Sequence, residues 1–360
     1  MILPKVCQRG QRISLRGATL SRKAQWNHAH IVTPHFRPYS GKEMIQTVKG
    51  MKDVEGLDYD KFSYVTSTAS KIAASFGYSN IMTNILEPEE LFKRSLGQYS
   101  DIVNKEMYSF EDLGKRRLVL RPEGTAGVIR HLLNDSGKLH SLHKSNLKYF
   151  YQGPMYRYER PQAGRQRQFY QMGIENLCMN DSGPIHDLEI ILLADTILKE
   201  IVPSQKDLVL EINSLGSPGV MSSYNKLLVE YFTLPENWSR LSKQSQMRVE
   251  NKNPLRVLDS KNPADQEVSL GSPKIQDVYD KESREKFEGV ITGLDSLGIK
   301  YQINPNLCRG LDYYEHTCFE YKYNSKKLGR SQNTILAGGR YDGLAQYLGH
   351  SEPISSVGNV

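Results

Sequence analysis

The sequence contains no uninterrupted apolar run that approaches the roughly 20 residues of a membrane-spanning helix. Its most apolar segment, LEIILLADTIL, is interrupted by Asp195 and is typical of a helix in a protein core. Cysteine is also scarce, and the four cysteines show no CxxC spacing. The HxxH pair of His140 and His143 has no partner ligands nearby in the sequence. The sequence therefore predicts no membrane span, no metal site and no disulfide framework, and its few cysteines fit a reducing compartment.

Acidic residues are absent from residues 1–42, which contain eight lysines and arginines before the first carboxylate, Glu43. An acid-free segment with arginines and serines is typical of a mitochondrial presequence, and we expect one over residues 1–40. FRPYS at residues 36–40 resembles a matrix-protease cleavage site. The alternative is a disordered basic tail that touches nucleic acid.

The net charge of +7 does not indicate a broad nucleic-acid surface. Without the eight cations of residues 1–42, the remaining chain has 39 basic and 40 acidic residues. Any site for a polyanion must then be local, because the body of the protein has no general positive field.

Apolar periodicity and turn residues predict a mixture of helices and hairpin-paired strands from residue 44 onward. We expect a helix over 58–78, a helix from Pro122 and another over 185–201. A polar stretch at about 214–285 has only helical pieces. Strands are expected at 79–86, on both sides of a turn at Leu113–Gly114, and at 147–160, 165–178, 207–213, 299–307 and 308–323. Residues 334–349 read as a strand, a tight glycine turn and a helix. This pattern predicts an α+β fold around an antiparallel sheet.

The stretch YRYERPQAGRQRQFYQMGIE, residues 156–175, combines arginines with aromatic side chains in a predicted hairpin. A period of two divides it into an apolar packing face, with Tyr170, Met172 and Ile174, and a second face. The second face has Arg157 and Glu159 on one strand, and on the other it has Phe169, Gln171, Gly173 and Glu175.

This second face suits a ligand, because an arginine can clamp a phosphate and an aromatic ring can stack on a base. Gly173 would leave room above the sheet, and Arg160, Arg165 and Arg167 in the turn would form a mobile cationic clasp. The alternatives are a nucleic-acid grip and a solvated pair of strands with cross-strand charge pairs.

Two further stretches support a ligand site. Glu123 and Thr125 in LRPEGTAG stand at a predicted helix start, where exposed backbone N–H groups can fix a small polar ligand, although ordinary capping would explain them too. CRGLDYYEHTCFEY places Arg309 and the pair Tyr313 and Tyr314 in a predicted strand.

Taken together and in this order, these stretches resemble the histidyl-tRNA synthetase family, which belongs to the class II aminoacyl-tRNA synthetases. The resemblance runs from VKGMKDV at residues 48–54 to AGGRYDGLAQYLG at 337–349. It includes LFKRSLG, KEMYSFED, LRPEGTAG, GPMYRYERPQAGRQRQFYQMGIE, NPLRVLDSKNP, ESREKF and RGLDYY. RGLDYY and AGGRYDG resemble the two histidine-specific signatures of the family, and the hairpin resembles its motif 2.

The resemblance implies a class II catalytic fold over residues 44–360, with a helical insertion at about 214–285. It also implies ATP- and Mg²⁺-dependent formation of histidyl-adenylate, followed by transfer of histidine to the 3′ end of tRNA(His). The expected protein is a mitochondrial matrix enzyme, also cytoplasmic if an alternative start is used, that forms a homodimer.

The resemblance also assigns roles to single residues. Arg157 would hold the α-phosphate, Phe169 would stack on adenine, Glu159 would meet the adenine amino group, and Arg165 would meet the outer phosphates. Arg309 would act as a fixed cation beside the histidine carboxylate and the α-phosphate, and with Arg157 it is the expected catalytic residue. The expected histidine-binding residues are Glu123, Thr125, Arg157, Gln171, Glu175, Arg309, Tyr313 and Tyr314. Glu175 and the two tyrosines would read the imidazole ring.

The sequence also departs from the family. Only SVG, at residues 356–358, resembles the start of motif 3, and no anticodon-binding domain follows. We therefore expect a C-terminally incomplete or alternatively ended product of a synthetase gene. If residue 360 is the terminus, we expect the central sheet to lose a strand and the adenine site to lose one wall. Thr83–Asn84 stands where the family usually has a proline at the dimer interface. These departures leave a second reading open, in which the chain is a catalytically impaired regulatory or structural subunit, docked for example on a ribosome, a polymerase or a phosphoribosyltransferase.

Overall fold

The structure is a computed structural model. It describes residues 44–97, 100–162, 164–179, 183–308, 313–324 and 333–360. Residues 47–360 form one compact unit, to which all elements given below belong. Arg309 and the proposed presequence lie outside the described residues.

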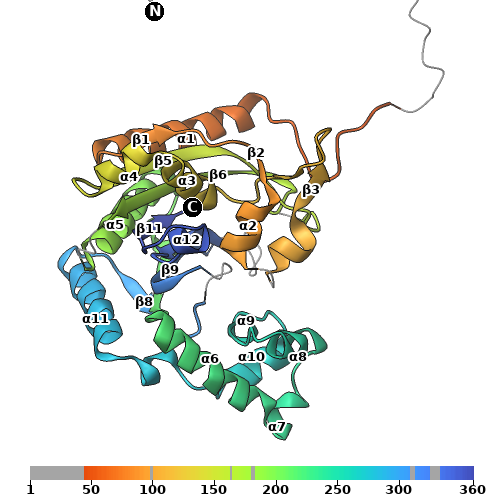
Figure 1. The fold of residues 1–360 in the computed structure, drawn as a ribbon, viewed down its shortest axis with the longest axis vertical. Helices are drawn as coiled ribbons and strands as arrows, with labels where there is room; N and C mark the ends of the chain where they lie inside the picture. The colour runs from red at the N-terminus through yellow and green to blue at the C-terminus, as the bar shows by residue number, and fades with distance from the viewer. Residues whose placement is uncertain (1–43, 98–99, 163, 180–182, 309–312, 325–332) are drawn as a thin grey trace, which may run out of the picture. The chain divides into compact units, whose positions relative to one another are not determined.

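The main element of the fold is an eight-stranded sheet with the strand order β1-β5-β6-β11-β10-β9-β7-β8. The outer pairs β1–β5 and β7–β8 are parallel, and all other neighbours are antiparallel. This confirms the predicted α+β fold around an antiparallel-dominated sheet (Figure 1). Its strands are β1 Ser79–Ile81, β5 Leu147–Tyr156, β6 Gln168–Cys178, β7 Leu208–Ser214, β8 Tyr301–Ile303, β9 Glu315–Tyr323, β10 Thr334–Arg340 and β11 Ser355–Asn359.

Three helices cover one face of this sheet: α1 (Gly56–Ser75), α5 (Ile185–Ile201) and α11 (Lys281–Ser296). Their apolar side chains share one core with the strands, in which Ile174 of β6 is buried and Met172 packs at the edge. The predicted packing face of β6 is thus confirmed for Met172 and Ile174, whereas Tyr170 is exposed. Because side chains alternate along a strand, Phe169, Gln171 and Glu175 project from the opposite face.

A three-stranded sheet with the order β2-β4-β3 is the second sheet of the fold, and it contacts the short helix α2. Its strands are β2 Leu86–Pro88, β3 Tyr108–Glu111 and β4 Arg117–Leu120. The neighbouring helical elements are α2 Glu89–Leu96, the π-helical turn η1 Ile102–Glu106, α3 Thr125–Leu133, α4 Ser136–Leu142 and α12 Leu344–Tyr347. Phe92, Leu132 and Leu344, from three of these helices, belong to one buried cluster.

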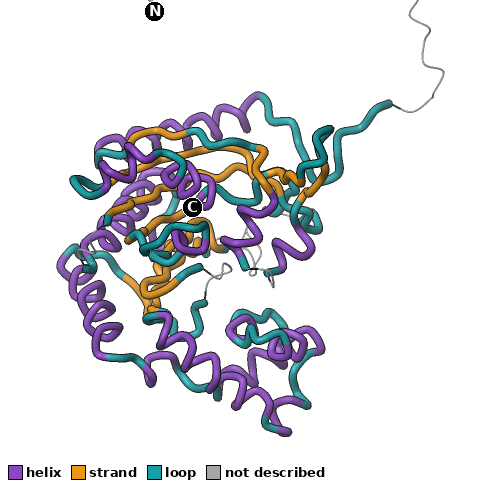
Figure 2. The backbone as a smooth tube through the Cα atoms, in the orientation of Figure 1, coloured by secondary structure: helices purple, strands orange, loops and turns teal. Residues whose placement is uncertain are grey.

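The connection from β7 to β8 is helical, as Figure 2 shows by its purple segments. After η2 (Gln205–Asp207) and β7 it contains α6 Pro218–Thr233, α7 Pro235–Trp238, α8 Lys243–Glu250, α9 Leu255–Leu258, α10 Pro263–Leu270 and η3 Ile275–Val278. Apart from the 16-residue α6, these helices have at most eight residues, and a buried carboxylate links three of their segments. Asp265 accepts hydrogen bonds from the hydroxyls of Ser242, Ser245 and Ser260 at 2.6–2.8 Å.

The expected loss of a strand from the central sheet is wrong. Residues Ser355–Asn359 form β11, which pairs with β6 on one side and with β10 on the other. The five residues of β11 are all buried. The strand therefore joins the two halves of the sheet.

Several local predictions also need correction. The predicted strand 79–86 is divided between β1 and β2, which belong to different sheets. The helix expected from Pro122 begins at Thr125, because the carboxylate of Glu123 bonds its first backbone amides. The strand expected over 308–323 begins only at Glu315, so Tyr313 and Tyr314 precede it.

The glycine turn expected in AGGRYDG is present directly before α12. Gly338 and Gly339 are inside β10, and the turn is at Asp342–Gly343. A Cβ on Gly338 would stand 2.3 Å from the carbonyl oxygen of Gly358, so this glycine allows close approach of two strands rather than a turn.

Candidate active site

The hairpin of β5 and β6 positions one edge of the candidate site. The two strands pair from Leu147–Leu177 to Tyr156–Gln168, so β5 ends just before Arg157. Arg157 donates from Nε to the carbonyl oxygen of Pro122 at 3.0 Å, and its guanidinium lies 5.2 Å from the centroid of the Phe169 ring. The structure thus brings together the expected phosphate clamp and the expected adenine platform.

Glu159 and Arg165 also lie at this edge, and they pair with each other. Arg165 Nη1 is 2.9 Å from Glu159 Oε2, and the arginine side chain is half exposed. Because the Arg165 side of the pair is half exposed, an incoming ligand can reach its guanidinium. Glu159 can then accept a hydrogen bond from an N–H group of a ligand, and Arg165 can bind an anionic group of the same ligand.

The start of α3 provides the second edge of the site. The buried carboxylate of Glu123 accepts hydrogen bonds from the backbone amides of Thr125 at 2.6 Å and Ala126 at 3.0 Å. Burial raises the pKa of Glu123 above its usual range. The capping role considered from the sequence is present, and the unused lone pairs of the carboxylate can still accept a bond from a ligand.

Glu175 lies beneath this edge and is fully buried. Its Oε1 accepts a hydrogen bond from the Thr125 hydroxyl at 2.7 Å, and its Oε2 accepts one from the Tyr341 hydroxyl. Burial raises the pKa of Glu175 to about 8, although both hydroxyls favour its ionised form. The site therefore contains an acid that can hold a proton near neutral pH.

The space that Gly173 was expected to leave is filled. A Cβ on Gly173 would stand 2.1 Å from the Tyr151 ring, and one on Gly124 would stand 2.2 Å from it. Tyr151 of β5 is thus clamped between β6 and the start of α3. Its buried hydroxyl and the buried Oε1 of Gln171 have no hydrogen-bond partner among the described residues.

Three tyrosines form a buried aromatic group beside Glu175. The ring centroids of Tyr313 and Tyr314 are 4.8 Å apart, and that of Tyr341 is 5.5 Å from Tyr313. Tyr341 was not predicted as a site residue, although it belongs to the RYDG segment that carried part of the resemblance. The signal that could have revealed it is its place directly after a strand that ends at the site. Arg309, the expected fixed cation, lies outside the described residues.

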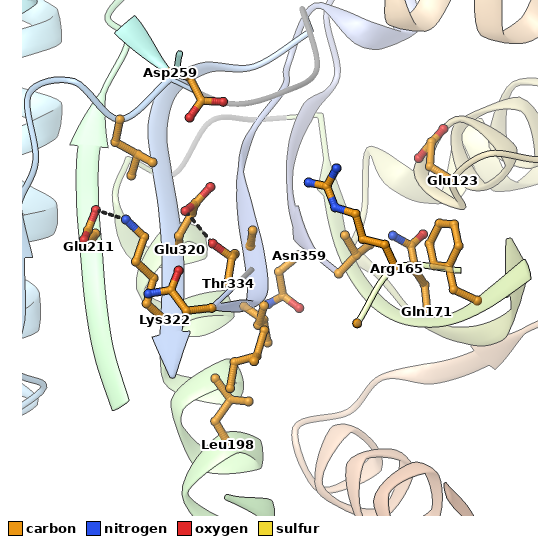
Figure 3. Close-up of a pocket in the computed structure, with 18 of the residues that line it drawn as sticks. Glu123, Arg165, Gln171, Leu198, Glu211, Asp259, Glu320, Lys322, Thr334 and Asn359 are labelled. Atoms are coloured by element: carbon orange, nitrogen blue, oxygen red, sulfur yellow. Dashed lines mark hydrogen bonds and ion pairs between the residues drawn. The ribbon is translucent and has the colours of Figure 1, made fainter. Parts of the chain in front are cut away.

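A cavity of about 1020 Å³ connects most of the predicted residues. Figure 3 shows Glu123, Arg165 and Gln171 on one side of it, and Glu211, Glu320 and Lys322 of β7 and β9 on the other. Of the predicted site residues, those that line the cavity are Glu123, Thr125, Arg157, Glu159, Arg165, Phe169, Gln171 and Tyr313. Glu175 and Tyr314 are buried next to these residues.

The arrangement suits recognition of a flat base and an anionic group at the Arg157–Phe169 edge, and of a small polar molecule at the Glu123–Thr125 edge. Among the described residues, no group of three or more His, Cys, Asp or Glu side chains is arranged to hold a metal ion. No helix in the described part of the chain is long and apolar enough to cross a membrane.

Comparison with known proteins identifies the family. A family model for histidyl-tRNA synthetase matches residues 50–230. The histidine–tRNA ligase of Rickettsia felis is 45% identical over 316 residues, which are 88% of this chain and 73% of the relative. That of Orientia tsutsugamushi is 46% identical over 305 residues, which are 85% of this chain and 69% of the relative.

Solved structures show the same likeness. The apo histidyl-tRNA synthetase of S. aureus is 32% identical with a TM-score of 0.67, and the match covers 88% of this chain and 71% of that one. A protein from Bacillus halodurans C, described as an ATP phosphoribosyltransferase regulatory subunit/histidyl-tRNA synthetase, shares the fold at 22% identity and a TM-score of 0.63. That match covers 89% of this chain and 81% of the other. On the family model and the identity to these relatives, the chain belongs to the histidyl-tRNA synthetase family.

Proposed function

We propose that this protein is a histidine–tRNA ligase, which activates histidine with ATP and transfers it to the 3′ end of tRNA(His). The observation that carries the proposal is the position of Glu175, a buried acid that accepts hydrogen bonds from Thr125 and Tyr341. It lies on the same β5–β6 hairpin as the Arg157–Phe169 pair. This arrangement offers one place for an imidazole and a neighbouring place for a nucleotide.

The histidine end would use hydrogen bonds for selection. The hydroxyl of Thr125 already donates to Glu175, so it can only accept a further bond, which suits a ligand ammonium group. The unpaired Oε1 of Gln171 is a second acceptor for the same group. A pocket of this kind rejects a ligand without matching donors, because its buried polar atoms would then remain unpaired.

The ATP end would use charge and stacking. Arg157 would contact the α-phosphate and the histidine carboxylate, Phe169 the adenine ring, Glu159 its amino group and Arg165 the outer phosphates. Attack of the carboxylate on the α-phosphate brings two anions together, and oriented guanidinium groups of Arg157 and Arg309 would stabilise the charge that develops.

Mg²⁺ fits this site as a companion of ATP. Proteins usually hold Mg²⁺ through substrate phosphates and one or two carboxylates, and the described residues contain no cluster of three or more potential ligands. Because Glu159 is assigned to the adenine amino group, the ATP phosphates would supply most of the ligands. The ion would supply further neutralisation of phosphate charge.

Histidine-dependent exchange between ATP and pyrophosphate tests the activity. We expect exchange that requires histidine and Mg²⁺ together, and charging of tRNA(His) transcripts by the same preparation. A soluble, folded protein without exchange would favour the second candidate, a regulatory or structural subunit. The fold shared with the Bacillus halodurans C protein described as a phosphoribosyltransferase regulatory subunit supports keeping that candidate.

The two predicted ends of the site are separable by mutation. Glu175→Ala should raise the KM for histidine by about a hundredfold, because it removes a buried ligand-reading carboxylate, and should leave the KM for ATP within about twofold. The exchange assay measures both constants. A comparable loss of ATP affinity would mean that Glu175 has another role.

Arg309→Ala is the complementary variant. It should lower kcat for adenylation by about a hundredfold and change histidine binding little, because its charge would act mainly on the transition state. Pre-steady-state adenylate formation and equilibrium histidine binding measure the two effects. Equal losses in both would contradict a role in charge neutralisation.

We also propose that the protein acts in the mitochondrial matrix, and additionally in the cytoplasm if an alternative start is used. The acid-free composition of residues 1–42 supports this proposal. Import of the full chain into isolated mitochondria, compared with a chain that begins at Glu43, tests it. We further propose a homodimer, supported by exposed apolar side chains on β2 and β3.

A further inference from the structure

We propose that residues 48–52, VKGMK, are a positioning element for the Arg157–Phe169 edge, and that they act through Gly50. The inference rests on the proposed function, because that function assigns this edge to ATP. It is carried by contacts between Gly50 and residues 165–168, the limb of the hairpin that leads into β6.

The backbone of Gly50 is bonded to this limb twice. Its carbonyl oxygen accepts a hydrogen bond from the amide of Arg167 at 2.7 Å and another from the amide of Gln168 at 3.3 Å. A turn bond from the Met51 amide to the Val48 carbonyl, at 2.9 Å, holds the glycine at the tip of the segment. Gln168 is the first residue of β6, so Gly50 fixes the point where that strand begins.

The contact continues from Arg167 to the candidate site. The carbonyl oxygen of Arg167 accepts a hydrogen bond from the amide of Arg157 at 2.9 Å. The peptide groups of Arg167 are therefore held by Gly50 on one side and by Arg157 on the other. Phe169 follows Gln168 directly, so a displacement of the segment would move both the expected phosphate clamp and the adenine platform.

The side chain of Arg167 belongs to this support and not to a mobile clasp. Its guanidinium lies 3.7 Å from the centroid of the Tyr158 ring, and its Nε donates to the carbonyl oxygen of Glu159 at 3.2 Å. Arg165 is also engaged, by Glu159, as described above. The expected cationic clasp is thus corrected for Arg167, whereas Arg165 can still turn to a ligand.

Only glycine fits at residue 50. Its φ is +82°, and a Cβ would stand 2.8 Å from Cγ of Arg167 and 2.9 Å from Cγ of Pro161. Cγ of Arg167 is close to the backbone, and its guanidinium is held by Tyr158, so the side chain has little freedom to move away. A side chain at residue 50 would push the limb away from the segment.

The histidine end has separate supports. Glu175 is held by Thr125 of α3 and by Tyr341 after β10, and neither residue belongs to the outer part of the hairpin. A displacement that begins at Gly50 should therefore affect ATP before it affects histidine. This difference separates a positioning role from a general contribution to folding.

Gly50→Ala tests the proposal, with Gly77→Ala as its matched control. Gly77 has a φ of +84°, and a Cβ there meets nothing within 4 Å among the described residues, so the control has the same backbone strain without the contact. We expect Gly50→Ala to raise the KM for ATP by about tenfold, with the KM for histidine within about twofold. Both variants should share the loss of stability that backbone strain causes, and Gly50→Ala should lose more because of its added contacts.

An unchanged KM for ATP in Gly50→Ala, or equal rises for ATP and histidine, would overturn the positioning role. A rise in Gly77→Ala of the same size would also overturn it, because strain alone would then explain the effect. Hydrogen exchange of the Arg167 and Gln168 amides in the unmodified full chain provides a second test without any variant. Protection of both amides is expected, and exchange at the rate of an open loop would contradict the proposal even in a protein without ligase activity.

Discussion

At the scale of single residues, Glu175 is a fully buried acid in the candidate site. Burial raises its pKa from 4.5 to about 8, so the folded protein binds a proton that the unfolded chain releases between these values. The folded state is therefore favoured below about pH 4.5, and this advantage is lost as the pH rises to about 8. The shift corresponds to an upper limit of about 5 kcal/mol.

Glu175→Gln should remove this dependence, because the amide has no proton to lose and can still bond both hydroxyls. We expect the stability difference between wild type and variant to change by several kcal/mol, in the variant's favour, from pH 5 to pH 8.5. Urea unfolding at both pH values measures it. Parallel curves for the two proteins would show that Glu175 does not titrate in this range.

Tyr151 and Tyr341 allow a matched comparison around the same carboxylate. Tyr341 donates to Glu175, whereas the Tyr151 hydroxyl has no partner among the described residues. Tyr341→Phe should destabilise the protein by about 1–3 kcal/mol, because it removes a donor to a buried acid, and Tyr151→Phe should be neutral or stabilising. Thermal unfolding of both variants at pH 8.5 measures the contrast. The opposite ranking would mean that Tyr151 is the main partner of Glu175.

The period of two was sufficient to predict part of the arrangement of β6. Phe169 and Gln171 line the cavity and Glu175 is buried beside Thr125, but Tyr170, Met172 and Ile174 of the other face reach the cavity wall too. The period could not predict that Tyr151 from the neighbouring strand fills the space above Gly173, because this depends on side-chain packing between strands. Tyr341 meets Glu175 from 166 residues away, a contact that only the assembled sheet creates.

At the scale of secondary structure elements, a buried ion pair connects α5, β10 and β11. Arg340 of β10 pairs with Asp187 of α5, and both side chains are almost fully buried. Arg340 Nη1 also donates to the Ser355 hydroxyl of β11 at 2.7 Å. The pair therefore holds a helix against the strands that precede and follow the candidate site residue Tyr341.

Arg340→Met should destabilise the protein by about 3–5 kcal/mol, because it leaves the Asp187 carboxylate buried without its partner. Arg94→Met is the control, since Arg94 pairs with Glu90 at 2.7 Å on the surface and its loss should cost less than about 1 kcal/mol. Chemical unfolding measures both values. Adding Asp187→Leu to Arg340→Met should restore part of the stability, and no recovery would argue against an uncompensated charge as the cause.

Helices and strands with strong periodicity were predicted within a few residues. Helix α1, strand β7 and the β5–β6 hairpin agree with their predicted ranges because their local patterns and their tertiary positions favour the same structure. Residues 79–86 were less predictable, since the division into β1 and β2 is made by two different partner strands. Strand β11 was expected to be absent, and it forms because its residues are paired on both sides.

At the scale of the whole molecule, one face of the small β2-β4-β3 sheet is apolar and partly exposed. Register and period place Leu86, Leu118, Leu120, Tyr108 and Phe110 on the same face. Leu86 and Phe110 expose 45% and 39% of their surface, whereas Val119 on the other face is fully buried. An apolar patch of this kind is typical of an interaction surface, and in a homodimer two copies of it would cover each other.

Replacing Leu86 and Phe110 together by lysine should separate the proposed homodimer, because burial of two unpaired ammonium groups at the interface is unfavourable. We expect the dissociation constant to rise by about two orders of magnitude, with the mass from light scattering falling from two chains to one at micromolar concentration. Leu270→Lys is the control, since Leu270 is 73% exposed on α10, far along the chain from this sheet. A dimer that survives the double substitution would place the interface elsewhere, and a wild-type protein with the mass of one chain would refute the dimer itself.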